Sequence, residues 1–370
     1  MADLGLSLMM VTDQADIQYL TGARDLLGTL PMVLLVPVEG DCTLVTRAVD
    51  AQAFIPQSTG ALVVEYLDHE SPVEAICAGV RDYAIARGER FGATLRGTEL
   101  SASMIDHLRA ELAELTWVDA SDIVWGLCAV KSDTELAHMR EAARINDEAL
   151  SHAVSVMRPG VRDQEVAAAL VDAMTRAGSH MIPGYHQVVS GLRTLTAHAT
   201  HNGSVLAEDD HVLFEFTACR YRYNAPLMRT AVIGRVPAPL ERLHEAAVHA
   251  LDAAIGAMAA EATSADVDAA AAAELQRWGV RHLRPHRTGY LVGASPAATR
   301  GGWPQGHIMN LRAGDRSVLV ENMTFHLPMA LYDPEHGAVG VSETVRVGPT
   351  GGEALGSMPR ELLRALSTAK

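Results

Sequence analysis

Apolar and polar positions follow two different periods along this chain of 370 residues. In the first third, the runs PMVLLVPVEGDCTLVT and ALVVEY have the short, β-branched character of strands, and the Glu-Gly-Asp step in the first run predicts a turn. After them, SPVEAICAGVRDYAIARG and SASMIDHLRAELAEL carry apolar residues at helical spacing, and the first of these helices is expected to end at Gly88. Residues 1–127 therefore predict an α/β unit that folds by itself.

A second unit is expected to begin near the segment VWGLCAVKSDTEL. There, Ser132 is followed three residues later by Glu135, which is the signature of a capping box at a helix N-terminus. The apolar positions that follow mark one face of a long helix, which a Pro-Gly pair closes. Asp163 then opens a second helix that ends near Gly178.

The order helix, helix, strands recurs later in the chain. Residues 239–260 predict a helix, ATSADVDAAAAAELQRWG predicts a second one, and strand-like runs follow. This is a weak internal duplication at roughly 100 residues, too long for a solenoid repeat. We expect an α+β architecture for residues 128–370, with paired helices packed on one side of a curved antiparallel sheet. The strand candidates are HVLFEF, TAVIG, SVLVE, TFHLPMALY and VGVSETVRV.

Composition and charge exclude several classes of partner. The formal net charge of −15 comes from scattered acidic residues, and no basic stripe could neutralise phosphates, so we expect no nucleic acid partner. No apolar run reaches the roughly 20 residues that span a bilayer, which argues against a membrane partner. The first residues do not have the pattern of a signal peptide, and the four cysteines are widely spaced. We expect a cytoplasmic protein.

Several segments match, in order, the motifs of one enzyme family. They are IQYLTG, CAVKSDTELAHMREAARINDEAL, HATHNGSVLAEDDHVLFEF, YNAPLMRTAVIG, PHRTGYLVG, NMTFHLPMALY and VGVSETVRVG. Together they resemble the creatinase/methionine-aminopeptidase family, which includes aminopeptidase P and has the pita-bread fold. The resemblance covers nearly the whole chain. It implies a creatinase-like N-terminal α/β domain over 1–127, a pita-bread catalytic domain over 128–370, and a homodimer.

The family's metal-binding positions are altered in this sequence. Its metallopeptidases bind two metal ions through two aspartates, one histidine and two glutamates. Proline offers no ligand, tyrosine is a poor one for hard divalent cations, and a two-metal site needs several donors at once. The resemblance therefore implies no metal and no other cofactor, as in the ectoine-hydrolase branch and in creatinase. The residues at the five positions are Glu215, Pro226, Tyr290, Pro328 and Ser342.

Four residues are the candidates for catalysis. His198 matches the family's catalytic histidine, and imidazole moves protons well near neutral pH; His201 is the alternative. Glu215 lies within an apolar strand, where a carboxyl needs an ion-pair partner or a function. Glu343 lies beside a former ligand position. If its carboxylate and that of Glu215 converge in one cleft, they would supply an acid beside a base. The alternative for Glu343 is an exposed strand residue without a catalytic role. Tyr290 replaces a ligand and can donate a hydrogen bond to the substrate.

Five residues are the candidates for substrate binding. Arg222, Arg229 and Arg287 can bind a carboxylate through paired hydrogen bonds. For Arg229 the alternative is a structural ion pair. Tyr223 and His326 complete the set, with simple packing and a role in the core as the alternatives.

The resemblance implies a hydrolase that acts on a C–N bond of a small molecule. The substrate is expected to be a carboxylate-bearing amidine, guanidine or amide, with ectoine as the first candidate. Glu343 or Glu215 would activate water, and His198 would protonate the departing nitrogen. The alternatives are a lyase or natural-product enzyme on the same scaffold, a peptidase with one weak metal, and a degenerate Xaa-Pro peptidase-like protein that binds rather than cleaves.

Overall fold

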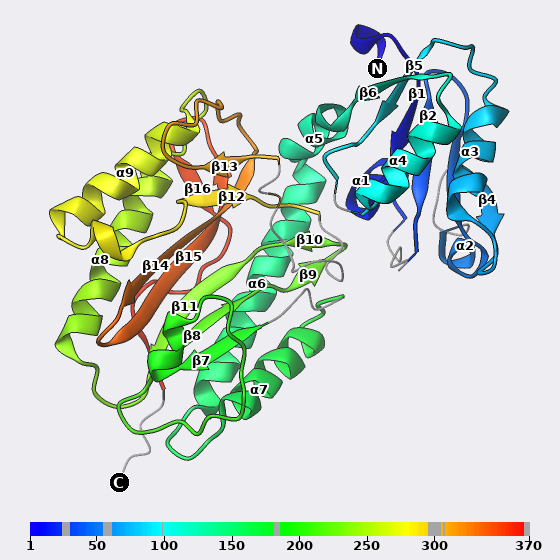
Figure 1. The fold of residues 1–370 in the computed structure, drawn as a ribbon. Helices are drawn as coiled ribbons and strands as arrows, with labels where there is room; N and C mark the ends of the chain where they lie inside the picture. Colours follow the sequence, from blue (N-terminus) through cyan, green and yellow to red (C-terminus); the bar gives the residue numbers. More distant parts are fainter. Residues whose placement is uncertain are drawn as a thin grey trace. The chain divides into compact units, whose positions relative to one another are not determined.

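The computed structural model describes residues 1–23, 30–54, 61–97, 99–180, 186–294, 305 and 308–365. The chain forms two compact units, Met1–Cys128 and Ala129–Lys370 (Figure 1). The division lies next to the boundary that the sequence predicts after residue 127. Each unit has its own apolar core.

The first unit is a sheet covered by helices on both faces. Its elements are β1 (Leu6–Val11), α1 (Gln14–Thr21), β2 (Val33–Pro37), β3 (Cys42–Arg47), α2 (Ala48–Phe54), β4 (Ala61–Tyr66), α3 (Pro72–Asp82), β5 (Arg90–Ala93), α4 (Ala102–Glu111), β6 (Thr116–Asp119) and α5 (Ser121–Ala129). The strand order is β4-β3-β2-β1-β5-β6. Because side chains alternate along β1, Leu8 and Met10 pack with α3 and α4, whereas Met9 and Val11 pack with α1, α2 and α5.

The sequence predicts most elements of this unit correctly. The strands β2, β3 and β4 lie where the apolar runs place them. Helix α3 ends earlier than expected, at Asp82, and Ala84 then has a positive φ of 51° that is incompatible with a continuing helix. The segment VWGLC, near which the sequence predicts the boundary, lies in α5. Val124 in this helix packs into the core of the first unit.

The second unit contains two sheets and two helix pairs. Its elements are α6 (Asp133–Val156), α7 (Asp163–Arg176), β7 (Gln187–Ser190), β8 (His211–Phe216), β9 (Cys219–Arg220), β10 (Tyr223–Asn224), β11 (Leu227–Val232), α8 (Ala238–Gly256), α9 (Ser264–Arg277), β12 (Gly289–Leu291), β13 (Asn310–Leu311), β14 (Thr324–Asp333), β15 (Gly337–Val347), β16 (Gly352–Ala354) and β17 (Leu363–Arg364). One sheet has the order β17-β11-β8-β7 and the other the order β13-β12-β14-β15-β16, while β9 and β10 form a short ribbon. The α+β class is confirmed, with two sheets where the sequence predicts one.

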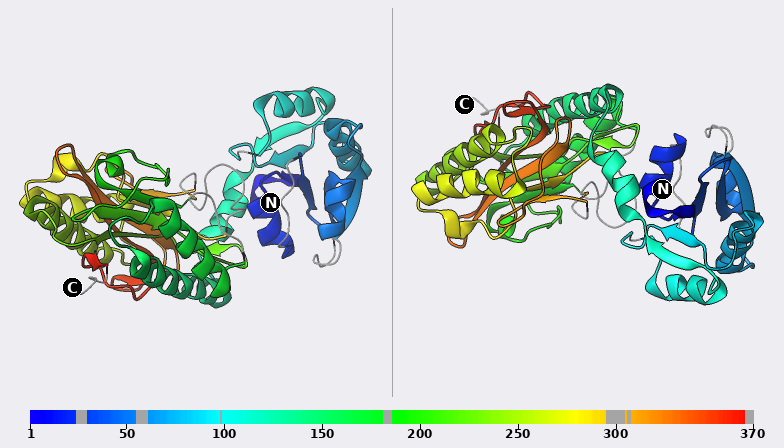
Figure 2. Two further views of the ribbon diagram at one scale, coloured as in Figure 1. Left: turned by 90° about the horizontal axis from the view of Figure 1, so that it is seen from below. Right: turned by 90° about the horizontal axis from the view of Figure 1, so that it is seen from above.

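Each helix pair covers one face of one sheet. Helices α6 and α7 pack on β7, β8 and β11, and helices α8 and α9 pack on β14 and β15 (Figures 1 and 2). Along β8, Phe214 and Phe216 point to the helices, so Leu213 and Glu215 point to the opposite face. The same alternation in β14 and β15 decides which strand residues face away from the helices.

The capping box at the start of α6 is confirmed. The Ser132 hydroxyl accepts a hydrogen bond from the Glu135 backbone, and the Glu135 carboxylate accepts one from the Ser132 backbone at 2.7 Å. The strand expected at SVLVE is wrong. Val318 makes only an isolated bridge with Thr263, so the segment does not pair along a neighbouring strand. Leu319 is buried, but the side chains of Val318 and Val320 are exposed. Among the described residues, no helix is both long and apolar enough to cross a membrane.

Candidate functional site

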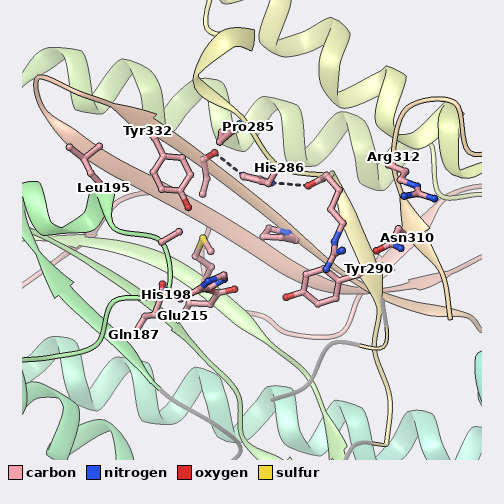
Figure 3. Close-up of a pocket in the computed structure, with 15 residues that line it drawn as sticks. Gln187, Leu195, His198, Glu215, Pro285, His286, Tyr290, Asn310, Arg312 and Tyr332 are labelled. Carbon is pink, nitrogen blue, oxygen red and sulfur yellow. Dashed lines mark hydrogen bonds between the residues drawn. The ribbon is translucent and has the colours of Figure 1, made fainter. Parts of the chain in front are cut away.

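A cavity of about 740 Å³ lies in the second unit, between the faces of the two sheets that the helices leave uncovered (Figure 3). Its size is in the range of small-molecule sites. Residues of β7, β8 and β11 line one side, and residues of β12, β13 and β14 line the other. The strand side chains that reach it are those that alternate away from the helix pairs, and loop residues complete the lining.

Glu215 is the carboxyl group of this cavity. It pairs with Gln187 on β7 and with Met228 on β11, so these three side chains lie in one row across the sheet. Glu215 is only 7% exposed, and among the described residues no hydrogen bond or ion pair holds its carboxyl group. Burial raises its pKa to about 7. A carboxyl group with this pKa can take up and release a proton near neutral pH.

His198 lies in the loop that leads to β8 and lines the same cavity. Its φ of 64° is in the left-handed region, which is uncommon for a residue with a side chain and is often found at functional sites. The buried Asp163 at the start of α7 anchors this loop. Its carboxylate accepts hydrogen bonds from the Arg193 side chain at 3.2 Å and from the Gly203 backbone at 2.8 Å. The alternative residue His201 is exposed and does not line the cavity.

Tyr290 belongs to a chain of buried polar groups. Its hydroxyl group lies 2.8 Å from Nδ1 of His326, and Nε2 of His326 lies 2.7 Å from Oγ of Ser342. Ser342 Oγ also accepts a hydrogen bond of 2.7 Å from the backbone N–H of Met228. Burial lowers the pKa of His326 to about 3, so its ring is neutral at physiological pH. Tyr290 lines the cavity, and His326 and Ser342 lie behind it.

Two arginines bring positive charge to the cavity. The guanidinium group of Arg287 lies 4.7 Å from the centre of the Tyr290 ring, and the exposed Arg312 lies at the same wall. His286 lies between Arg312 and Tyr332 in Figure 3. Its ring nitrogens lie 2.7 and 3.0 Å from the carbonyl oxygens of Arg287 and Ala330. Clustered guanidinium groups favour an anionic ligand.

Gln187, Arg312 and Tyr332 also line the cavity, although no motif of the sequence predicts them. Tyr332 was accessible to sequence reasoning, because it lies four residues after Pro328 and therefore on the same face of a strand. Burial raises its pKa, and the nearby Glu215 charge raises it further. Gln187 and Arg312 belong to no recognisable motif, and only the folded chain brings them to this wall.

Glu343 and Arg229 do not reach the cavity, contrary to expectation. Their side chains form a buried ion pair, with Nη2 of Arg229 2.6 Å from Oε1 of Glu343, and Arg360 adds a second contact at 3.1 Å. Ser342 faces the polar chain behind Tyr290, so its neighbour Glu343 faces the opposite side of the strand. The expected roles in activating water and in binding substrate therefore do not fit these positions. The alternative for Arg229, a structural ion pair, describes what the structure shows.

Arg222 and Tyr223 also lie outside the residues that line the cavity. Arg222 lies in the turn between β9 and β10, where it has a positive φ of 70°, and Tyr223 is the first residue of β10. The Tyr223 hydroxyl donates a hydrogen bond of 2.9 Å to the Glu135 carboxylate, which ties the ribbon to the first turn of α6. Of the residues that the sequence predicts, the structure brings four together at the cavity: His198, Glu215, Arg287 and Tyr290.

The residues at the family's metal-binding positions do not fit a two-metal centre. Only Glu215 carries a carboxylate, and Pro226 offers just a backbone carbonyl, which accepts a hydrogen bond of 2.9 Å from Thr344. The oxygens of Tyr290 and Ser342 belong to the chain through His326. Over the described parts of the chain, no three His, Cys, Asp or Glu side chains are grouped so that they could hold a metal ion.

Comparison with known proteins defines the class. The chain belongs to metallopeptidase family M24, whose model matches residues 137–349. The Creatinase/Prolidase N-terminal domain matches residues 1–130. The protein is thus a two-domain member of a family of hydrolases and peptidases, and the resemblance drawn from its motifs is confirmed.

Individual relatives are similar to this chain over nearly its whole length. An uncharacterized hydrolase/peptidase of Sinorhizobium fredii is 30% identical, over 98% of this chain and 93% of its own length. Ectoine hydrolase of Halomonas elongata is 23% identical, over 98% of this chain and 94% of its own. The structure of an Xaa-Pro dipeptidase from Bacillus anthracis superimposes with a TM-score of 0.83 at 22% identity, covering 98% of this chain and 96% of that one. The last similarity shows a shared fold.

Proposed function

We propose that this protein is a metal-independent hydrolase that cleaves a C–N bond in a small, carboxylate-bearing amidine, guanidine or amide, in the manner of ectoine hydrolase. The observation that carries the proposal is the Glu215 carboxyl group. It lies in a cavity of small-molecule size, has no hydrogen bond or ion pair to another described residue, and has a pKa raised by burial to about 7. These are the properties of a general base.

In the proposed reaction, the Glu215 carboxylate takes a proton from water while the water oxygen bonds to the carbon under attack. The bond from this carbon to the departing nitrogen then breaks, and the nitrogen keeps the electron pair and takes a proton from His198. The proton on Glu215 returns to His198 through solvent, so one water is consumed and both groups are restored. Tyr290 stabilises the charge that develops on the reacting group, as donors in an oxyanion hole do.

The charges of the cavity support an anionic substrate. Arg287 lies against Tyr290, and Arg312 lies at the same wall, so a substrate carboxylate bound by either group would place the C–N bond within the cavity that Glu215 lines. Holding the substrate in this way supplies part of the catalysis, because it replaces a random encounter with a fixed geometry. The similarity to ectoine hydrolase makes ectoine the first substrate to test.

The test is to incubate the purified protein with ectoine, 5-hydroxyectoine, creatine and Xaa-Pro dipeptides, each with and without a chelator. Products are followed by mass spectrometry, which detects the addition of one water. We expect hydrolysis of a non-peptide substrate at a rate that the chelator does not change. Stoichiometric metal in the active protein, or activity that the chelator abolishes, would contradict the proposal.

The similarity to an Xaa-Pro dipeptidase favours a second candidate, a peptidase-like protein that binds a peptide without cleaving it. The variant Glu215→Gln separates the two functions. A binding protein would keep its affinity and show no turnover in either form, whereas a hydrolase would lose its turnover. Glu208→Gln is a matched control, because Glu208 is an exposed glutamate in the loop before β8.

A further inference from the structure

We propose that Ser342 and His326 are positioning residues that orient Tyr290 as a hydrogen-bond donor to the substrate. The inference rests on the proposed function of the cavity. It concerns two former metal-ligand positions, Tyr290 and Ser342, which the fold now joins through one histidine. The three side chains come from β12, β14 and β15, where Tyr290 is the direct partner of His326 and Pro328 is the direct partner of Ser342.

The donor and acceptor in each of these hydrogen bonds can be assigned from the contact between Ser342 and the backbone of Met228. The backbone N–H of Met228 can only donate, so Ser342 Oγ accepts at this contact of 2.7 Å. Ser342 is fully buried, and within the described parts of the chain its hydroxyl oxygen has one other partner, Nε2 of His326 at 2.7 Å. The serine hydrogen must therefore go to His326. Were Nε2 protonated, Ser342 would bury a hydroxyl hydrogen with no acceptor, which is destabilising.

The protonation of His326 then settles what Tyr290 does. The ring is fully buried, and an imidazole that accepts a hydrogen bond at Nε2 carries its hydrogen on Nδ1. Nδ1 thus donates to the Tyr290 hydroxyl oxygen at 2.8 Å. The hydroxyl hydrogen of Tyr290 is therefore not donated to His326, and Tyr290 lines the cavity in which a substrate would bind. Each bond in such a chain strengthens the next one.

This arrangement determines whether the Tyr290 hydroxyl group donates or accepts a hydrogen bond at the substrate. With the opposite tautomer of His326, the tyrosine would donate to the histidine and could only accept from the substrate. With the Nδ1–H tautomer, it donates toward the charge that develops as water adds. Arg287, 4.7 Å from the ring centre, holds positive charge over the same side chain. A preorganised donor of this kind is worth roughly 10²–10³ in kcat in other hydrolases.

The decisive experiment reads the tautomer by ¹⁵N NMR of the full chain labelled at histidine. The His326 signals are identified by their loss in His326→Gln. We expect the Nδ1–H tautomer, unchanged between pH 5 and 8. An Nε2–H tautomer or a protonated ring in this range would overturn the proposal, and this result does not depend on knowing the substrate.

A kinetic experiment tests the consequence. With a hydrolysed substrate, Tyr290→Phe and Ser342→Ala should each lower kcat with KM nearly unchanged, and the double variant should lose little more than Tyr290→Phe alone. Fully additive losses, or a loss confined to KM, would overturn the positioning role. The control is Thr324→Val, which removes a buried hydroxyl that donates to the Val292 carbonyl at 2.8 Å and should leave kcat unchanged. If no substrate is hydrolysed at all, the proposed function is wrong. The NMR measurement of the His326 tautomer still tests the direction of the hydrogen bonds from Ser342 to Tyr290.

Discussion

Two glutamates are buried in the second unit, and their surroundings are opposite. Glu215 on β8 is 7% exposed and Glu343 on β15 is 2% exposed. Arg229 and Arg360 neutralise Glu343, whereas among the described residues no cation or hydrogen-bond donor meets Glu215. Burial alone therefore does not mark a catalytic carboxylate. Glu215 differs from Glu343 because its desolvation is left uncompensated next to a cavity, and for this reason we propose Glu215 as the catalytic group.

The difference is set by the two faces of a strand. Successive side chains of a strand point to opposite faces of its sheet. Glu215 of β8 points to the cavity, whereas Glu343 of β15, in the second sheet, points to the helices. On the helix side, Arg360 also binds Asp252 of α8, so Glu343 belongs to a network that joins helix and sheet. One glutamate is therefore expected to control the reaction and the other the stability of the fold.

The largest expected effect is on the reaction. Glu215→Gln keeps the shape of the side chain but cannot take a proton from water, so kcat should fall by about 10²–10⁴ with little change in KM. Steady-state kinetics on the identified substrate measures this fall. Glu208→Gln should keep wild-type rates. A variant Glu215→Gln that turned over at the wild-type rate would remove the distinction between the two glutamates.

The next effect is on stability. Glu343→Gln leaves the charge of Arg229 buried opposite a neutral partner, and we expect a loss of about 3–5 kcal/mol in the free energy of unfolding. Urea denaturation measures it. The control is Glu353→Gln, because Glu353 forms exposed ion pairs with Arg140 and Arg346, whose loss should cost about 0–1 kcal/mol. Equal losses in both variants would show that the buried pair has no special role.

The pH dependence of stability provides a third test. Burial raises the pKa of Glu215 from 4.5 to about 7, so between these values the folded protein holds a proton that the unfolded chain has released. Raising the pH through this window therefore favours unfolding, by about 3 kcal/mol in total. Glu215→Gln lacks this group, so it should become more stable than wild type above pH 7. Denaturation of both proteins at pH 4.5, 6 and 8 would show a constant difference if the pKa were not raised.

The smallest expected effect concerns substrate binding. Replacing Arg287 by Met removes a charged donor from the cavity wall. KM for an anionic substrate should rise by about 10- to 100-fold, since hydrogen bonds to charged groups contribute about 1.5–3 kcal/mol. An uncharged analogue of the substrate should show no such rise. Arg316→Met is the charge-matched control on the exposed surface. A fall in kcat with KM unchanged would assign Arg287 to the reaction instead.

The sequence alone was sufficient for the family, the two units and most elements. Helix α6 could be predicted from its capping box and apolar face, and β8 from an apolar run that matches the strand residue for residue. These features are local, because capping, periodicity and strand propensity depend on neighbours in the chain. His198 and Glu215 could be singled out for a similar reason, since both lie at motif positions of the family.

Only the tertiary structure separated Glu215 from Glu343. Both are acidic residues in apolar strands, and a shift of one position along a strand turns a side chain from the cavity to the helices. The ion pair of Glu343 joins β15 to β11, and the polar chain behind Tyr290 joins β12, β14 and β15. Contacts between residues more than 100 positions apart, such as Arg229 and Glu343, leave no trace in local periodicity, so the folded chain alone decides which carboxyl group is left without a partner.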